Sequence, residues 1–314
     1  MRVFVIGGTG VVGRRLVPLL VATGHDVVAS TTAPAKLSLI EQMKAHAVQL
    51  DVLDAAATRR AIQDAKPDAI VHQATALSHL SNNFRNMDRI FAKTNQLRTA
   101  GTRNLLAAAE EFGVQRIIAQ SYCGWPYPRE GSWVKTENDP LDTHPLPAAT
   151  KTIAAIVEQE RLISEHGGVV LRYGGFYGPG TSLAPGGPQY QAVRKRLLPV
   201  VGDGAGVISF IHVDDAATAA LAALTNGAGI YNIVDDEPAA ARDWIPYLAT
   251  AIGAKPPRHV PAWLARVAAG QIPAEMMTHG RGGSNAKAKA ELSWRPQYAT
   301  WREGFKKGLG ERLG

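Results

Sequence analysis

A glycine-rich turn between an apolar run and a helical pattern is the feature that most constrains this chain. Residues 3–6 form a continuous run of apolar, β-forming residues, which is typical of a strand buried on both faces. Three glycines follow at intervals of three: Gly7, Gly10 and Gly13. Apolar residues then recur at helical spacing up to Gly24. The order strand, glycine turn, helix predicts a phosphate-binding βα unit, because a helix N-terminus favours an anion.

Each glycine has a predicted part in binding a dinucleotide. Gly7 permits the tight turn, Gly10 lets the backbone approach a pyrophosphate, and Gly13 allows the helix to pack closely on the strand. The segment Gly-Gly-Thr-Gly-Val-Val-Gly resembles the extended and atypical branches of the short-chain dehydrogenase/reductase superfamily, which are NAD-dependent epimerase/dehydratase-like. The resemblance implies a Rossmann-type α/β fold, a doubly wound parallel sheet with a small C-terminal substrate lobe.

The overall composition fits an α/β protein with a large core. The chain has 314 residues, of which 46% are hydrophobic and 19% charged. Cys123 is the single cysteine, so no disulfide framework can form and a reducing compartment is favoured. No apolar run reaches membrane-spanning length, and the first predicted strand leaves no room for a signal peptide. We therefore expect a cytoplasmic protein without membrane contact.

The net charge of +7 indicates a solvated basic surface or a phosphate-rich ligand. The densest basic points are residues 194–196 and 306–307, and neither is interleaved with aromatic residues. Nucleic acid is therefore not an expected partner. The expected partner is a small-molecule substrate, and a homodimer is left open.

The end of the second predicted strand, residues 25–30, indicates which cofactor is bound. An acidic residue there would bind the ribose 2′-hydroxyl and select NAD, but residues 30–36 contain no carboxylate. Thr32 and Lys36 could bind a 2′-phosphate instead, so NADP is favoured and NAD remains possible. Many similar atypical members carry an arginine at the position of Thr32.

The resemblance implies further cofactor contacts along the chain. Asp51 follows the third predicted strand, where the family contacts the adenine amino group, and Asp54 is a predicted N-cap for a helix over residues 55–65. Residues 71–76 resemble the family's V-x-H-x-A-A segment, in which we expect His72 to be a buried, hydrogen-bonded residue. No metal site is predicted. The predicted cofactor-binding residues are Gly7, Thr9, Gly10, Val11, Val12, Gly13, Thr32, Lys36, Asp51, Val52, Ala74, Thr75, Ala76, Lys151 and Tyr173.

The resemblance extends over nearly the whole chain. Residues 101–109 resemble GT-x-NLL-x-AA within a predicted long helix over 88–112, residues 171–180 resemble LR-x-x-x-x-YGPG, and residues 210–217 resemble F-x-HVDD-x-A. The implied dinucleotide-binding domain covers residues 1–172, with 205–234 returning to it. Residues 173–204 and 235–314 form the implied substrate-binding lobe.

The predicted active site departs from the family at one position. The family pairs a tyrosine with a lysine four residues later on one helical face. Lys151 is present, but Pro147 stands where the tyrosine belongs, and proline suits the first turn of a helix. Ser121, at the end of the fifth predicted strand, matches the family's serine. In the family the serine orients the carbonyl, the tyrosine donates the proton, and the lysine binds the nicotinamide ribose.

Another group would have to donate the proton if the chain reduces a carbonyl. The candidates, in order of preference, are Tyr173, Tyr122 and His144, so the predicted catalytic residues are Ser121, Lys151, Tyr173 and Tyr122. Tyr122, Trp125 and Tyr127 suggest a partly apolar substrate, and the polar residues of 77–85 are a candidate rim.

The sequence leaves three functions open. An NADP-dependent oxidoreductase acting on a carbonyl or hydroxyl group is favoured. The alternatives are a non-redox epimerase, lyase or cyclase on the same fold, and a non-catalytic NADP-binding regulator.

Overall fold

A parallel sheet of seven strands forms the centre of the protein. The computed structural model describes residues 1–77 and 84–310. The strand order is β12-β7-β5-β4-β1-β2-β3. Strands after β1 are added first toward the β3 edge and then toward the β12 edge, so the order switches between β1 and β4, where doubly wound folds bind ligands. This arrangement confirms the predicted Rossmann-type fold. The strands are β1 (Arg2–Ile6), β2 (Asp26–Thr31), β3 (His46–Gln49), β4 (Ala69–His72), β5 (Arg116–Tyr122), β7 (Val169–Tyr173) and β12 (Gly229–Ile233).

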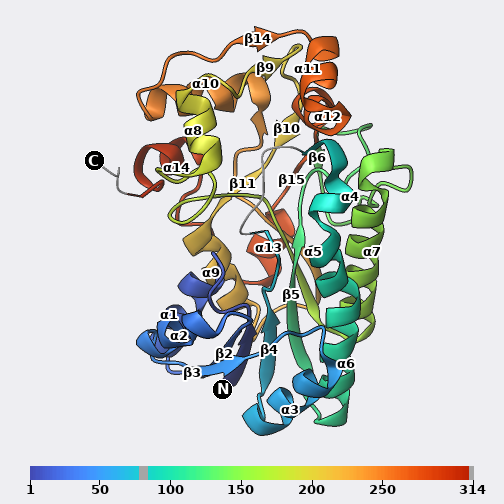
Figure 1. The fold of residues 1–314 in the computed structure, drawn as a ribbon, viewed down its shortest axis with the longest axis vertical. Helices are drawn as coiled ribbons and strands as arrows, with labels where there is room; N and C mark the ends of the chain where they lie inside the picture. Colours follow the sequence, from blue (N-terminus) through green and yellow to red (C-terminus); the bar gives the residue numbers. More distant parts are fainter. Residues whose placement is uncertain (78–83, 311–314) are drawn as a thin grey trace.

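Helices cover both faces of the sheet (Figure 1). Val3 and Val5 of β1 point to one face, while Phe4 and Ile6 point to the other, so each face has its own apolar core. The first face is covered by α1 (Gly13–Ala22), α2 (Leu37–Gln42), α9 (Val213–Ala222) and α13 (Ala286–Glu291). The second is covered by α3 (Ala55–Ala65), α6 (Thr102–Glu111) and α7 (Thr150–Glu165).

The helix predicted over residues 88–112 is broken into shorter pieces. These are α4 (Met87–Ile90), α5 (Ala92–Gln96), a π-helical turn (Leu97–Gly101) and α6. The short α4 places the Asp88 carboxylate against the first turn of α7, where it accepts hydrogen bonds from the backbone N–H groups of Lys151 and Thr152 at 3.0 and 2.8 Å. An acidic partner for those N–H groups stabilises the start of α7.

A second group of elements lies beyond the carboxyl ends of the strands (Figure 1). Its core contains Tyr177, Phe210 and Trp301 and is separate from the two sheet cores. The helices of this lobe are α8 (Pro188–Arg194), α10 (Ala241–Ala251), α11 (Ala262–Ala269), α12 (Gln271–His279) and α14 (Trp301–Lys307). Short strand pairs complete it: β6 (Val134–Lys135) with β15 (Gly282–Gly283), β8 (Gly175–Tyr177) with β11 (Phe210–His212), β9 (Val200–Val201) with β14 (His259–Val260), and β10 (Val207–Ile208) with β13 (Ala239–Ala240).

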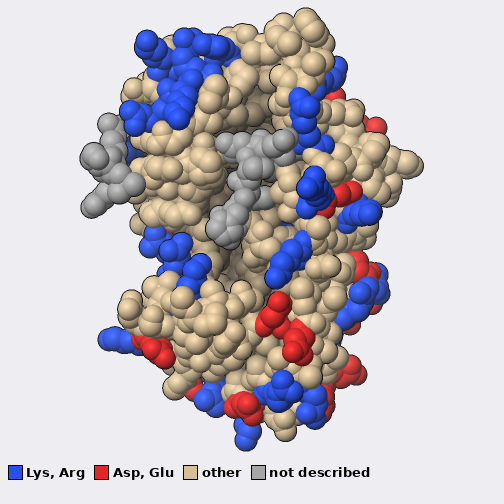
Figure 2. Space-filling model, viewed as in Figure 1, with Lys and Arg blue, Asp and Glu red and all other residues tan. Residues whose placement is uncertain are grey.

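The charged side chains are unevenly distributed on the face seen in Figure 2. Lys and Arg gather at its upper left, over α8 and α10, whereas both signs are mixed at the lower edge. Within residues 1–77 and 84–310 no helix is long and apolar enough to cross a membrane. The same residues contain no cluster of three or more His, Cys, Asp or Glu side chains placed to hold a metal ion.

Candidate functional site

The glycine turn joins β1 to α1 at the centre of the sheet. Gly7 has φ +86°, and a Cβ there would lie 3.0 Å from the backbone of Ala74. A Cβ on Gly13 would lie 2.3 Å from the Gly7 carbonyl oxygen, whereas one on Gly10 would meet only that oxygen, at 3.2 Å. Gly7 and Gly13 are therefore required by the packing of the turn itself. Gly10 borders open space, which fits the approach of a pyrophosphate.

The N-terminus of α1 is suited to bind an anion. The helix begins without a capping side chain and without an acidic residue in its first turn. The N–H groups of Arg14 and Arg15 donate to the carbonyls of Gly10 and Val12, both at 3.0 Å, so within the described residues the N–H groups of residues 11–13 are the ones that can bind a ligand. Arg14 is exposed in that turn, and its guanidinium lies 3.4 Å from the Cβ position of Gly180, so the turn after β8 passes beside it. Arg14 is a candidate phosphate ligand that sequence reasoning missed, although a basic residue directly after the third glycine was a usable signal.

Hydroxyl and basic side chains lie at the end of β2, where the adenosine ribose of a dinucleotide is expected. Thr9 and Thr31 share a hydrogen bond of 3.0 Å between their hydroxyl oxygens. Thr32 and Lys36 are exposed beside them. This arrangement can accept a phosphate, since it offers hydroxyls and an ammonium and no carboxylate within residues 30–36.

Asp51 and Val52 lie between β3 and α3, directly after the strand next to β2. The Asp51 carboxylate accepts the Leu53 N–H at 3.1 Å and lies 3.7 Å from the Lys93 ammonium. It is 41% exposed and can still accept from a ligand. Val52 is buried, and a Cβ on Gly101 would lie 3.0 Å from its side chain.

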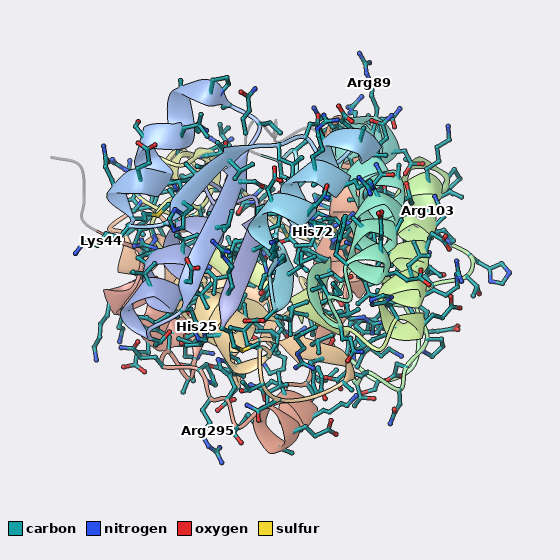
Figure 3. All side chains as sticks on the ribbon, turned by 90° about the horizontal axis from the view of Figure 1, so that it is seen from below. His25, Lys44, His72, Arg89, Arg103 and Arg295 are labelled. Carbon is teal, nitrogen blue, oxygen red and sulfur yellow. The ribbon has the colours of Figure 1, made fainter. Side chains whose placement is uncertain are left out.

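The segment after β4 borders the glycine turn. Thr75 and Ala76 are exposed there, and Ala74 is half-buried against Gly7. His72 lies inside the molecule, as Figure 3 shows, and burial lowers its pKa to about 4. It is therefore neutral at pH 7, and the prediction of a buried, hydrogen-bonded histidine is confirmed. Together with the open space at Gly10, these positions fit a dinucleotide.

Ser121 is held in a buried network beneath the strand ends. Its hydroxyl donates to Glu160 Oε1 at 2.6 Å. Arg172 donates to both oxygens of that carboxylate, at 2.8 and 2.6 Å, and to the Tyr127 hydroxyl at 2.9 Å. Tyr127 in turn donates to Asn232 at 3.0 Å. A hydroxyl has one proton to donate, and that of Ser121 is used in the hydrogen bond to Glu160. In this arrangement Ser121 does not donate to a substrate oxygen.

Lys151 and Pro147 do not face this network. Lys151 is exposed and lines a shallow hollow between α5 and α7, together with Asn95 and Thr99. Ile153, two residues further along, lines a different cavity. Two residues correspond to 200° around a helix, so the two side chains lie on nearly opposite faces. Lys151 therefore lines a different hollow from the cavity beside Ile153, and its hollow does not include Ser121.

The three candidate proton donors have different surroundings. Tyr173 is fully buried, donates to Ala216 O at 3.4 Å and accepts from Gln73 at 3.2 Å, and burial raises its pKa. His144 is exposed on a loop. Tyr122 is half-buried, and its ring lies 5.5 Å from that of Trp125; burial raises its pKa as well. Of the two tyrosines, Tyr122 is the more accessible to a ligand, because Tyr173 is 1% exposed.

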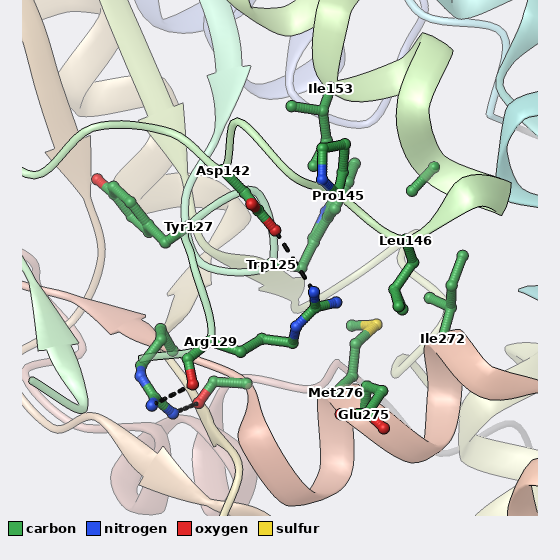
Figure 4. Close-up of a pocket in the computed structure, with 13 residues that line it drawn as sticks. Trp125, Tyr127, Arg129, Asp142, Pro145, Leu146, Ile153, Ile272, Glu275 and Met276 are labelled. Carbon is green, nitrogen blue, oxygen red and sulfur yellow. Dashed lines mark hydrogen bonds and ion pairs between the residues drawn. The ribbon is translucent and has the colours of Figure 1, made fainter. Parts of the chain in front are cut away.

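A cavity lies between the loop after β5, α7 and α12 (Figure 4). Its apolar wall includes Trp125, Leu146, Ile153, Ile272 and Met276. Its polar lining includes Arg129 and Asp142, whose charged groups are 3.7 Å apart. The cavity adjoins the start of α7, where Leu146 and Ala149 on either side of Pro147 line it.

Sequence reasoning missed two sets of residues here. Glu160 replaces an apolar residue in the stripe of Ile153, Ile156 and Ile163 on α7, and that charged interruption was a usable signal. Residues of α12 that line the cavity carried no local motif. Most of the predicted rim at 77–85 lies outside the described residues, because 78–83 are not described.

Comparisons with known proteins give a consistent result. Residues 3–234 match the model of the NAD dependent epimerase/dehydratase family. The chain is 41% identical over 309 residues to 3-diazoavenalumate denitrifying reductase from Streptomyces sp, covering 97% of this chain and 99% of that protein. It is 28% identical over 274 residues to 2-alkyl-3-oxoalkanoate reductase from Stenotrophomonas maltophilia (strain K279a), covering 81% and 76%.

The same fold occurs in solved structures. UDP-glucose 4-epimerase from Thermus thermophilus in complex with NAD is 25% identical, with a TM-score of 0.75 over 98% of both chains. The similarity covers both the sheet and the lobe above it.

Proposed function

This chain belongs to the NAD dependent epimerase/dehydratase family, and from that premise we propose that it is an NADPH-dependent reductase of aromatic diazo compounds. The reaction would replace the dinitrogen of an arenediazonium ion with hydrogen. The relative with 41% identity is named a denitrifying reductase of a diazo compound. The family and its reductase members support the wider assignment to NAD(P)-dependent oxidoreductases.

The surroundings of the expected catalytic residues favour this reaction over the reduction of a ketone. Ketone reduction needs a hydride and a proton donor beside the oxygen, and a positioned donor is worth about 10²–10⁴ in rate. Here Pro147 stands where the family's tyrosine is expected, the Ser121 hydroxyl donates to Glu160, and Lys151 lines a hollow other than the cavity. Replacement of dinitrogen by hydride needs no such donor, because the leaving group departs as neutral N₂.

In this proposal the residues of the chain bind and orient the cofactor and the substrate. The turn at Gly7 to Gly13 would hold the pyrophosphate, Thr32 and Lys36 the 2′-phosphate, and Asp51 the adenine. When bound, NADPH would supply a hydride to the carbon that carries the diazonium group, giving the arene, N₂ and NADP⁺. The apolar wall of the cavity would limit the access of water, which would otherwise replace N₂ to give a phenol.

Isotope transfer tests the proposed reaction. The protein is incubated with benzenediazonium and NADPH that carries deuterium at either face of C4. We expect benzene with one deuterium from one face only, N₂ release, and consumption of NADPH above the rate without protein. Benzene without deuterium, or the same rate without protein, would overturn the proposal.

Ketone reduction is the second candidate, and Tyr122 is the observation that favours it. Its half-buried phenol lies at the carboxyl end of β5 and could donate a proton. The relative with 28% identity is named a reductase of 2-alkyl-3-oxoalkanoates. A β-keto acid reduced in the presence of NADPH, with strong loss of rate in Tyr122→Phe, would support this function instead.

We predict that the protein binds NADPH more tightly than NADH. Lys36→Ala should weaken NADPH binding about ten- to a hundredfold, because a charge-assisted hydrogen bond contributes about 1.5–3 kcal/mol. NADH binding should stay within about twofold. Calorimetric titration measures both, and Lys195→Ala, an exposed lysine on the end of α8, is the matched control. Equal affinity of the parent for the two cofactors would contradict the prediction.

A further inference from the structure

We propose that Arg129 binds a carboxylate of the substrate, so that the cavity beside it selects an aromatic acid. The inference rests on the proposed function only in identifying this cavity as the substrate site. The evidence is that the other charged groups that line the cavity have hydrogen-bond partners within the protein, whereas the Arg129 guanidinium has N–H groups to spare in the described part of the structure.

The cavity has the lining of a small-molecule site, because its wall is mainly apolar and carries a few charged groups. Trp125 lines it from the loop after β5, Leu146 from the segment between β6 and α7, Ile153 from α7, and Ile272 and Met276 from α12. An aromatic ring entering at its mouth would lie against these side chains.

Arg129 extends its guanidinium into this cavity, between Asp142 and Met276 (Figure 4). Within residues 1–77 and 84–310 its one partner is Asp142, and the nitrogen and oxygen are 3.7 Å apart, which is beyond hydrogen-bond distance. The Arg129 side chain is 30% exposed. The N–H groups of Arg129 are thus available to a ligand in the described part of the structure.

The other charged groups of the cavity are already engaged. Arg281 donates to backbone carbonyls of residues 129 and 279 at 2.7 and 2.9 Å and stacks on Trp133 at 4.1 Å. Glu275 accepts from Arg266 at 2.9 Å. Asp142 accepts the backbone N–H of His144 at 2.9 Å, which fixes its carboxylate to the loop. Arg129 therefore has the greatest unused capacity for an anion.

A carboxylate is the ligand group that matches this geometry. The planar guanidinium offers two parallel N–H groups to the two oxygens of a carboxylate, and the apolar surroundings strengthen the contact. Asp142 competes for the same guanidinium, because its carboxylate lies 3.7 Å away and carries the same charge as the ligand group. Removing the charge of Asp142 should consequently help an acidic ligand.

Calorimetric titration of the full chain with cinnamate and cinnamamide, with and without NADP⁺, tests this inference. We expect the parent to prefer cinnamate, and Arg129→Met to weaken cinnamate about ten- to a hundredfold while cinnamamide is unchanged. Arg129→Lys should be intermediate, because it keeps the charge and loses the fork. Asp142→Asn should bind cinnamate as tightly as the parent or more tightly.

A purely structural Arg129–Asp142 pair would give a different pattern. Arg129→Met and Asp142→Asn would then weaken both ligands alike, and that result would overturn the inference, as would equal affinity of the parent for acid and amide. Thermal unfolding of each variant confirms that it is folded. Because binding is measured without turnover, acid-selective binding would refute the proposed function alone if deuterium is transferred neither to benzenediazonium nor to a diazonium ion that carries a carboxylate.

Discussion

Replacing Gly10 with valine should abolish NADPH binding and leave the protein folded. A Cβ at this position meets only the Gly7 carbonyl oxygen, at 3.2 Å, and the backbone of Gly10 does not have a positive φ. The isopropyl group would project into the open space where the pyrophosphate is expected to approach α1. We expect the NADPH dissociation constant to rise at least about a hundredfold, with reductase activity lost in parallel. Calorimetric titration and urea unfolding measure the two properties separately.

Gly13 provides the matched comparison within the same turn. A Cβ there would lie 2.3 Å from the Gly7 carbonyl oxygen and 2.7 Å from the Gly8 carbonyl group. Gly13→Ala should therefore lower the stability of the fold itself, because backbone atoms have to move. If Gly10→Val binds NADPH as the parent does, the cofactor does not lie on this turn.

The sheet was predictable because its signals are local. Residues 3–6 are apolar on both faces, and the glycine turn follows directly, so β1 and α1 lie where the pattern predicts. Asp54 is the N-cap of α3, with its carboxylate accepting the Ala57 N–H at 2.9 Å, as expected from its place before an alanine-rich segment. Such features depend on neighbours within four residues.

The break in residues 88–112 was not predictable from such signals. The segment carries apolar residues near both ends at helical spacing, yet α4 ends at Ile90 and a π-helical turn forms over Leu97–Gly101. Its position depends on α7, whose first turn binds Asp88, and on Val52, which lies against Gly101. Contacts between residues so far apart in the chain leave no periodic trace in the sequence.

The predictions for the candidate site divide in the same way, into residues that local motifs indicate and residues whose positions depend on distant contacts. The predicted cofactor residues follow motifs attached to strand ends, and most of them lie at the carboxyl ends of β1, β2, β3 and β4. The assignment of Lys151 rests on its spacing from the expected tyrosine position. Which face of α7 is buried depends on Ile153, Ile156 and Glu160 among others. Glu160 is buried against Arg172. That pairing depends on the fold, although a glutamate in an apolar stripe indicates it.

Among single substitutions of the charged residues of the site, Arg172→Met should lower the free energy of unfolding most. Arg172 and Glu160 are 4% and 5% exposed, and their side chains are joined by two hydrogen bonds. Removing the guanidinium leaves a carboxylate buried with Ser121 as its remaining side-chain donor. Breaking a buried pair in this way typically costs about 3–5 kcal/mol. Urea unfolding followed by circular dichroism measures the loss.

Arg161 is the control, because it binds Glu158 at 3.0 Å on the same helix but is 49% exposed. Arg161→Met should change stability by less than about 1 kcal/mol, since water solvates both partners. The double variant Arg172→Met with Glu160→Leu should recover much of the loss, because it removes the buried charge along with its partner. If Arg172→Met lowers the free energy of unfolding no more than Arg161→Met does, the buried pair does not hold α7 against β7.

The double variant separates two causes of the loss. If it is as unstable as Arg172→Met, the loss comes from packing and not from the unpaired carboxylate. Recovery in the double variant would therefore show that Glu160 needs Arg172 because its charge is buried, which is also the reason that Ser121 donates its proton there.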